Sequence, residues 1–138
     1  MNDLTPALIL GLPDSMDSSP SFEGGRRLTS NLTASGERFT AILAFDDITA
    51  YGAIRALSEG GRRVPDDCSV IGFDDIPTAA ISTPGLTTIR QPLLEMGEYA
   101  AENIFNALEQ GQGKQDQSYG ECHLMPTELV IRQSTRNL

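Results

Sequence analysis

Two stretches of the chain share one design, an apolar run of six residues that ends in a pair of aspartates. The first run, Thr40 to Phe45, ends at Asp46-Asp47, and the second, Cys68 to Phe73, ends at Asp74-Asp75. Runs that are apolar on both faces are typical of strands in a parallel sheet that helices cover on both sides. The sequence therefore predicts two buried strands with the same acidic chemistry at their ends.

A helix is predicted between these strands, because apolar residues recur there at intervals of three and four and Gly60-Gly61 follows as a stop signal. Strand, helical crossover and strand form a right-handed unit in which both strands run parallel and both carboxyl ends lie at one sheet edge. Ligands of open α/β sheets bind outside this edge. The apolar positions of the predicted helix are Ala50, Ala53, Ile54 and Leu57.

The rest of the chain fits one α/β domain, or part of one, with a parallel sheet flanked by helices. Loops are predicted at residues 14–20, 76–85 and 111–120, which are rich in Ser, Asp, Pro, Gly or Gln. The further predicted elements are a strand at Ala7–Leu10, a helix from an N-cap at Ser19 or Ser21 to about Leu32, a strand at Leu86–Ile89, a helix at Leu93–Leu108 and a strand at Glu128–Arg132.

Composition excludes several classes of function. Nineteen acids against ten Lys and Arg give a net charge of −9, which would repel a nucleic-acid backbone. No apolar run approaches the roughly 18 residues of a membrane span, and the N-terminus lacks the pattern of a secretory signal, so a cytoplasmic location is expected. Cys68 and Cys122 have no metal or redox spacing and are predicted to be buried thiols, while His123 is expected to pack in, or at the edge of, a strand.

The four aspartates differ in expected role. Asp47 stands where a helix N-cap is expected, whereas Asp46 precedes it and is placed to point across the sheet edge, as is Asp74 after its own strand. Carboxylates only accept hydrogen bonds, so such a pair can hold the hydroxyls of a sugar or ribose, or an ammonium group. Sequence alone thus favours a ligand-binding role for Asp46 and Asp74.

An enzyme would use these carboxylates as acid and base, or as cation ligands beside a lysine. The only lysine, Lys114, lies in the polar loop, and His123 belongs to a different element from either strand end. We therefore expect no catalytic residues, no metal site and no cofactor.

The helix after Asp47 has a second face. Ile48, Tyr51 and Arg55 recur at helical spacing on a side other than the one that covers the sheet. This face is either one more core contact or a surface for a partner.

Four ordered blocks of the chain resemble the effector-binding domain of lactose-repressor-type (LacI/GalR) transcription regulators. They are the stretches Thr40–Leu57, Arg63–Ile76, Thr83–Pro92 and Pro126–Arg132, and the likeness covers about residues 20–135. The resemblance implies a type I periplasmic-binding-protein-like domain, in which two lobes clamp a ligand. Only part of that domain is expected here.

The resemblance implies how the chain divides between the lobes. Residues 1–90 would belong to the second lobe, 91–120 to the crossover and a helix of the first lobe, and 121–138 to the return strand of the second lobe, with no DNA-binding domain in this chain. The helix Leu93–Leu108 would then lack partners for its apolar stripe. We expect it to dock on a neighbouring copy or to be poorly ordered.

The resemblance also assigns site residues. Asp74 matches the family's acid for ligand hydroxyls, and Gln91 the polar residue at the crossing between lobes. Asp46 stands where the family usually has Asn, and loss of the amide donors leaves room for a ligand other than a simple neutral hexose. The segment from Ser19 to Phe22 would line the pocket, with stacking as one role for Phe22 and core packing as the expected one.

Members of this family dimerise through the helix that corresponds to the one bearing Ile48, Tyr51 and Arg55, together with a loop near Ile81. The expected function is therefore the effector-sensing and dimerisation module of a bacterial DNA-binding transcription regulator. Its expected partners are a sugar or polyol effector, a second copy of the protein, and operator DNA through an N-terminal domain. The alternative is the solute-binding protein of a sugar transport system.

Overall fold

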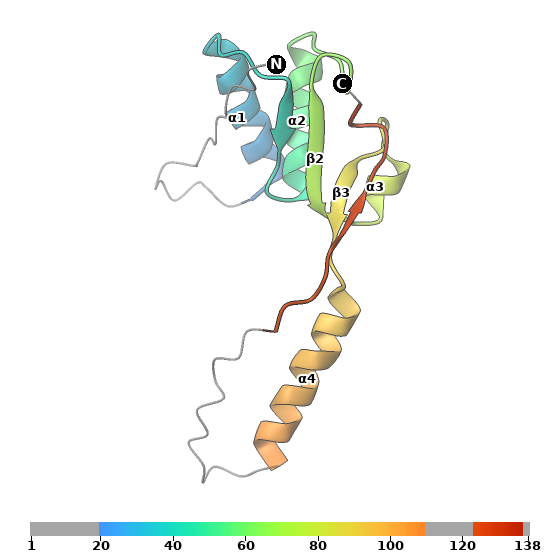
Figure 1. Ribbon diagram of the computed structural model, residues 1–138. Coiled ribbons are helices and arrows are strands. Elements are labelled where there is room, and N and C mark those ends of the chain that lie inside the picture. Colours follow the sequence, from blue (N-terminus) through green and yellow to red (C-terminus); the bar gives the residue numbers. More distant parts are fainter. Residues whose placement is uncertain (1–19, 110–122, 137–138) are drawn as a thin grey trace, which may run out of the picture. The chain divides into compact units, whose positions relative to one another are not determined.

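The computed structural model describes residues 20–109 and 123–136 (Figure 1). Ser19, Lys114, Cys122 and the predicted strand Ala7–Leu10 lie outside these residues. The chain divides into two compact units: unit 1 comprises Met1–Ile89 and Leu129–Leu138, and unit 2 comprises Arg90–Glu128.

The predicted parallel unit is confirmed. The strands β1 and β2, which α2 connects along the chain, pair with each other in parallel. Ala41 lies opposite Ser69 and Leu43 opposite Ile71. The four strands of the sheet follow the order β1-β2-β3-β4. Their bounds are β1 Ala41–Leu43, β2 Ser69–Asp74, β3 Thr87–Arg90 and β4 Glu128–Val130, and those of the helices are α1 Phe22–Ala34, α2 Asp47–Glu59, α3 Thr78–Ile81 and α4 Leu93–Glu109.

The starts of α1 and α2 show one prediction confirmed and one wrong. α1 begins after Ser21, whose hydroxyl oxygen accepts a hydrogen bond from the Gly24 N–H at 3.1 Å. α2 is capped by Asp46, not by Asp47 as predicted: Asp46 has extended backbone and its Oδ1 accepts from the Thr49 N–H at 2.6 Å. Asp47 is already the first helical residue, so its side chain is free for another role.

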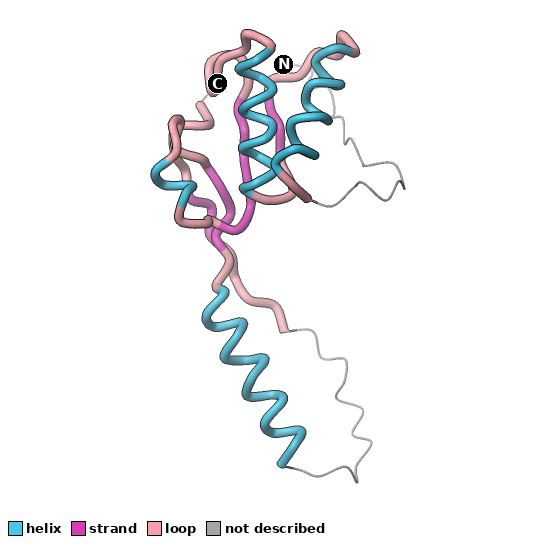
Figure 2. The backbone as a smooth tube through the Cα atoms, turned by 180° about the vertical axis from the view of Figure 1, so that it is seen from behind, coloured by secondary structure: helices cyan, strands magenta, loops and turns pink. Residues whose placement is uncertain are grey.

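The helices α1 and α2 cross with their backbones in contact. A Cβ on Gly25 would collide with the Thr49 carbonyl oxygen, and a Cβ on Gly52 would collide with the Phe22 carbonyl oxygen. Both helices lie on the same side of β1 and β2, as the view from behind shows (Figure 2). The absence of side chains at these two glycines thus brings the backbones of α1 and α2 into contact.

The core of unit 1 lies between α2, the sheet and α3, and consists of small and medium apolar residues. Cys68 is 1% exposed, so its prediction as a buried thiol is confirmed. The fully buried members of this core are Ala50, Leu57, Cys68, Val70, Ala79 and Leu86.

The expectation that helices cover both faces of the first strand is not met in the described part of the chain. Leu43 and Phe45, two residues apart and hence on one face, are each 75% exposed. The reason is that α2 packs on the opposite face, where Ile42 and Ala44 meet the core, and α1 packs on α2.

Two further details differ from the sequence-based expectations. The predicted loop 76–85 contains the four-residue helix α3, which Pro77 precedes without a side-chain cap, so the sequence holds no capping signal for it. His123 is not in a strand but in an exposed extended segment, where its ring stacks on that of Tyr99 with 4.4 Å between the ring centroids.

In unit 2, α4 has no buried residue. Its large apolar side chains are between 59% and 76% exposed at five positions, namely Leu93, Leu94, Ile104, Phe105 and Leu108. The stripe predicted to lack partners is therefore bare in the described part of the chain, and docking on another copy stays a prediction. Among the described helices, none is both long and apolar enough to cross a membrane.

Candidate ligand-binding site

Asp47 is the buried centre of the acidic sheet edge. It is 0% exposed, and both of its carboxylate oxygens accept hydrogen bonds. The Thr88 hydroxyl donates to Oδ1 at 2.5 Å, and the Ile76 backbone N–H donates to Oδ2 at 2.9 Å. One side chain thus joins the start of α2 to β3 and to the segment after β2.

Burial raises the pKa of Asp47 above its ordinary value of 3.8. The hydrogen bonds from Thr88 and Ile76 act against this rise in pKa, and the nearby charges of Asp74 and Asp75 add to it. The effect of lost hydration on the pKa of Asp47 is therefore larger than the opposing effect of its two hydrogen-bond donors.

This pKa shift predicts how stability changes with pH. The folded state holds the Asp47 proton more tightly than the unfolded state, so the contribution of this group to stability is greatest at low pH and is lost as pH rises through its folded-state pKa. Compared with Asp47→Asn, which does not titrate, the wild type should gain stability as pH falls from 7 toward 4. Urea denaturation of both proteins across that range measures the difference, and a difference that stays flat would contradict the prediction.

Asp74 and Asp75 form a turn with left-handed backbone, with φ of 109° and 54°. Asp75 is paired within the protein: its Oδ1 lies 2.7 Å from Nη2 of Arg132, and the two side chains are only 7% and 15% exposed. Nη1 of Arg132 also donates to the Leu86 carbonyl at 2.8 Å. Asp75 therefore has a structural partner in Arg132. Asp74 is the last residue of β2.

Asp46 follows β1 as the N-cap of α2, and Asp74 is the last residue of the neighbouring strand β2. Leu43 pairs with Ile71, and each aspartate lies three residues beyond its paired residue. The predicted juxtaposition of the two acids at one sheet edge is therefore confirmed as an arrangement of the backbone. Asp46 additionally caps α2, a role that the sequence had given to Asp47.

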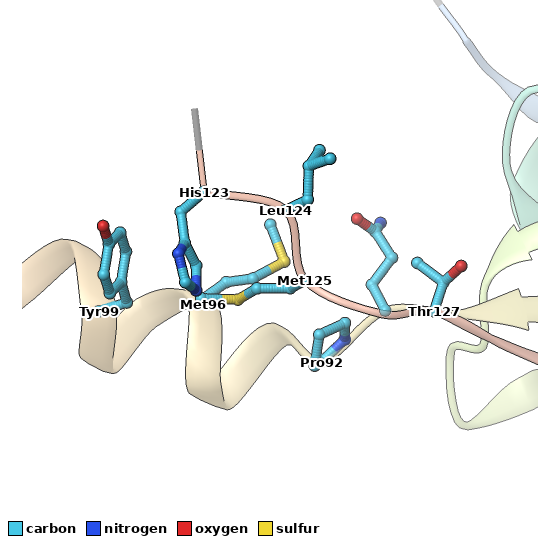
Figure 3. Close-up of a pocket in the computed structure, with 8 residues that line it drawn as sticks. Pro92, Met96, Tyr99, His123, Leu124, Met125 and Thr127 are labelled. Atoms are coloured by element: carbon cyan, nitrogen blue, oxygen red, sulfur yellow. The ribbon is translucent and has the colours of Figure 1, made fainter. Parts of the chain in front are cut away.

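The other residues predicted to contact the ligand are Phe22, Gln91 and Ser19. Phe22 is 42% exposed at the first position of α1, so the expected core packing is wrong. Gln91 belongs to unit 2, where it lines a pocket of about 250 Å³ together with Met96, Tyr99 and His123 (Figure 3). Ser19 lies outside the described residues.

The residues predicted to face a partner fall into two groups. Ile48 and Ile81 are 44% and 79% exposed, and the exposed Arg55 pairs with Glu59 at 2.8 Å. Tyr51 instead is partly buried against the core, and its hydroxyl has no hydrogen-bond partner in the described part of the chain. This face thus contains both a core contact, at Tyr51, and an open surface, at Ile48, Arg55 and Ile81.

Sequence reasoning missed Thr88 and Arg132 as neighbours of the aspartates. They contact Asp47 and Asp75 across 41 and 57 residues of chain, respectively. No local pattern marks such a contact. Among the residues that the structure describes, no group of three or more His, Cys, Asp or Glu side chains could hold a metal ion.

Comparison with known proteins identifies the family. The profile of the periplasmic binding protein-like domain matches residues 12–135. The chain belongs to this family. The proteins it resembles within the family are LacI/GalR regulators, so the resemblance drawn from its sequence blocks is confirmed.

Two curated relatives illustrate this membership. The transcriptional repressor PurR of Mannheimia succiniciproducens is 39% identical over 116 residues, which are 84% of this chain and 33% of that protein. The transcriptional regulator GalS of Salmonella typhimurium is 40% identical over 116 residues, with the same shares of the two chains. This member of the family thus spans about a third of the length of these relatives, which are transcription regulators and not enzymes.

Solved structures agree with this assignment. The lac repressor dimer bound to operator and an anti-inducer superposes with a TM-score of 0.72 at 35% identity, covering 83% of this chain and 38% of that one. A LacI family regulator from Enterococcus faecium with bound ribose gives a TM-score of 0.70 at 32% identity, covering 86% and 42%. The α/β architecture of the LacI-type effector domain is therefore present here.

Proposed function

We propose that this chain is the effector-sensing part of a bacterial transcription regulator of the LacI/GalR type, and that its effector is a sugar or a related polyol. The observation that supports this most directly is the similarity to regulators whose structures hold ribose or lactose. Sugar hydroxyls are donors, and the paired acids Asp46 and Asp74 at the sheet edge are acceptors.

In this proposal unit 1 is the second lobe of the effector domain and α4 is part of the first. Gln91, at the start of unit 2, would meet the ligand from the crossing between lobes, and Ser19 and Phe22 would line the pocket. Effector binding would close the lobes and shift the population of dimers that bind the operator. DNA contacts would come from a separate N-terminal domain, since a chain of net charge −9 repels phosphate.

The alternative, a solute-binding protein of a transport system, has less support. The curated relatives named above are DNA-binding regulators, matched over most of this chain. A regulator of this kind acts in the cytoplasm, without catalysis and without a cofactor.

The role of Asp74 is tested by thermal shift and calorimetry on the full-length protein. D-ribose, lactose, D-galactose and polyols are screened, and the sugar that stabilises the wild type is titrated into Asp74→Ala. We expect roughly 10- to 100-fold weaker binding, because a hydrogen bond to a charged group contributes about 1.5–3 kcal/mol. Asp66→Ala, which removes an exposed acid of unit 1, is the control and should bind normally. Equal affinity of wild type and Asp74→Ala would remove Asp74 from the site.

We further propose a homodimer that forms through the face around Ile48, Tyr51, Arg55 and Ile81. Its support is the exposure of Ile48 and Ile81 together with the similarity to a repressor that is dimeric. The double variant Ile48→Glu/Ile81→Glu should sediment as a monomer at concentrations where the wild type is a dimer, because two desolvated carboxylates per copy oppose association. Ser30→Glu, on the exposed side of α1, should leave the dimer intact; a dimeric double variant would place the interface elsewhere.

A further inference from the structure

The direction of the Asp74 side chain depends on a backbone turn in which both residues, Asp74 and Asp75, have an uncommon conformation. Both Asp74 and Asp75 have positive φ, a region that L-residues other than glycine visit rarely and as single residues. Such a turn persists only where surrounding contacts determine it. The question is which contacts do so here.

The backbone amides of the two residues after Asp74 are both connected to Asp47 by hydrogen bonds. The Ile76 N–H donates to Oδ2 of Asp47 at 2.9 Å. The Asp75 N–H lies 3.4 Å from the Thr88 hydroxyl oxygen, and this hydroxyl in turn donates to Oδ1 of Asp47. Of the two peptide units that follow Asp74, the first is therefore held by Oδ1 of Asp47 through the Thr88 hydroxyl, and the second by Oδ2 directly.

Arg132 holds the turn from another element. Its guanidinium pairs with the Asp75 side chain and donates to the Leu86 carbonyl, while its own N–H donates to the Thr87 hydroxyl at 2.9 Å. The Asp75 side chain is thus fixed by Arg132, the peptide before Asp75 by Thr88, and the peptide after it by Asp47. These contacts restrain the turn directly after Asp74, the last residue of β2.

Stability alone does not call for an acid at position 47. Asp47 and Thr88 are each 0% exposed, and a charge so buried is costly even when it is hydrogen-bonded. Apolar side chains of similar size in such places are often neutral or stabilising. What an apolar pair cannot supply is an acceptor for the Ile76 and Asp75 amides, so the orientation of the turn is the property that depends on this carboxylate.

We propose that Asp47 is a positioning residue of the effector site, which acts through the Ile76 amide and the Thr88 hydroxyl to hold the turn that aims Asp74. The effect on ligand binding rests on the proposed function of Asp74, whereas the effect on the turn does not. Asp47 itself need not touch the ligand.

The turn is tested first, without ligand, by NMR of the full-length protein. Thr88→Val removes the hydroxyl but keeps the shape of the side chain, Thr88→Ser restores the hydroxyl, and Asp47→Ala removes both acceptors. Below the melting transition, amide exchange at Ile76 and the HN–Hα couplings of Asp74 and Asp75 report the turn. We expect Ile76 to exchange at least about tenfold faster in Thr88→Val, with altered couplings, and Thr88→Ser to match the wild type.

A variant that is destabilised elsewhere separates positioning from general stability. Asp67→Ala removes the acceptor of the Arg63 N–H in the turn before β2 and should lower the melting temperature without altering the Asp74–Asp75 couplings. If Asp47→Ala does not fold, the comparison of Thr88→Val with Thr88→Ser still tests the proposal. An unchanged turn in Thr88→Val overturns the proposal.

Ligand binding is tested second, with D-ribose and lactose as the probes in calorimetry. Affinity for the sugar that binds should fall about tenfold in Thr88→Val and stay within about twofold of wild type in Thr88→Ser and Asp67→Ala. An altered turn with unaltered affinity would overturn the positioning role. A wild type that binds neither sugar would count against the proposed sugar-sensing function, and the coupling measurements alone would then decide whether Asp47 holds the turn.

Discussion

Replacement of Gly72 by alanine is expected to lower the free energy of unfolding by about 3 kcal/mol or more. Gly72 lies in the middle of β2, and a Cβ there would collide with Oδ1 of Asp47 and approach Cδ2 of Leu86 to 3.0 Å. Overpacking of a core costs about 1–3 kcal/mol. Displacement of Asp47 adds the loss of the Thr88 hydrogen bond to a buried charge, about another 1–3 kcal/mol.

Urea denaturation followed by circular dichroism measures this loss. Gly97→Ala is the matched control, because in the described part of the chain an added Cβ at that position of α4 would meet no atom beyond its own helix backbone and its two neighbours within 4 Å. Alanine in a helix interior should stabilise by up to about 1 kcal/mol, so the two Gly→Ala changes have opposite signs. The double variant Gly72→Ala/Asp47→Ala should lose less than the sum of the single variants, since it removes one of the colliding groups. A wild-type midpoint for Gly72→Ala would refute the role given to this close approach.

Arg132→Met is expected to destabilise the protein by about 3 kcal/mol, because it leaves the Asp75 carboxylate almost enclosed and without its cation. The side chains are 15% and 7% exposed, so water can replace little of the lost interaction. The Leu86 carbonyl also loses a donor. The same denaturation measurement applies.

The control for this pair is Arg90→Met. Arg90 lies 3.0 Å from Glu128, but these side chains are 49% and 68% exposed, and exposed ion pairs contribute only about 0–1 kcal/mol. Arg132→Met/Asp75→Leu should recover much of the loss because no charge is then left unpaired. If Arg132→Met and Arg90→Met cost the same, the Asp75 pair has no special weight.

The elements with strong periodic patterns were predictable from the sequence. The parallel unit of β1, α2 and β2 follows from two apolar runs and the helical spacing between them, and the apolar stripe of α4 follows from its own spacing, whereas its lack of partners was implied by the family resemblance. The juxtaposition of Asp46 and Asp74 at the sheet edge needed only the topology of that unit. These features depend on neighbours within one element or one crossover.

What could not be predicted depends on register or on distant contacts. The apolar run continues through Ala44 and Phe45 although β1 ends at Leu43, so the pattern could not say which aspartate caps α2. Phe22 is a core residue by type, yet it is 42% exposed, and its backbone makes a close contact with α2. Thr88 and Arg132 meet their aspartates only after the sheet has formed.

The contact between α1 and α2 has a mechanical consequence. Because the Gly25 and Gly52 backbones lie directly against the Thr49 and Phe22 carbonyls, no flexible side chain separates the helices at their crossing. Side chains absorb small shifts between elements by changing rotamer, whereas two backbones in contact transmit them. We therefore expect Asp46 and Asp47 at the start of α2 to shift together with Phe22 at the start of α1 when the acidic sheet edge moves.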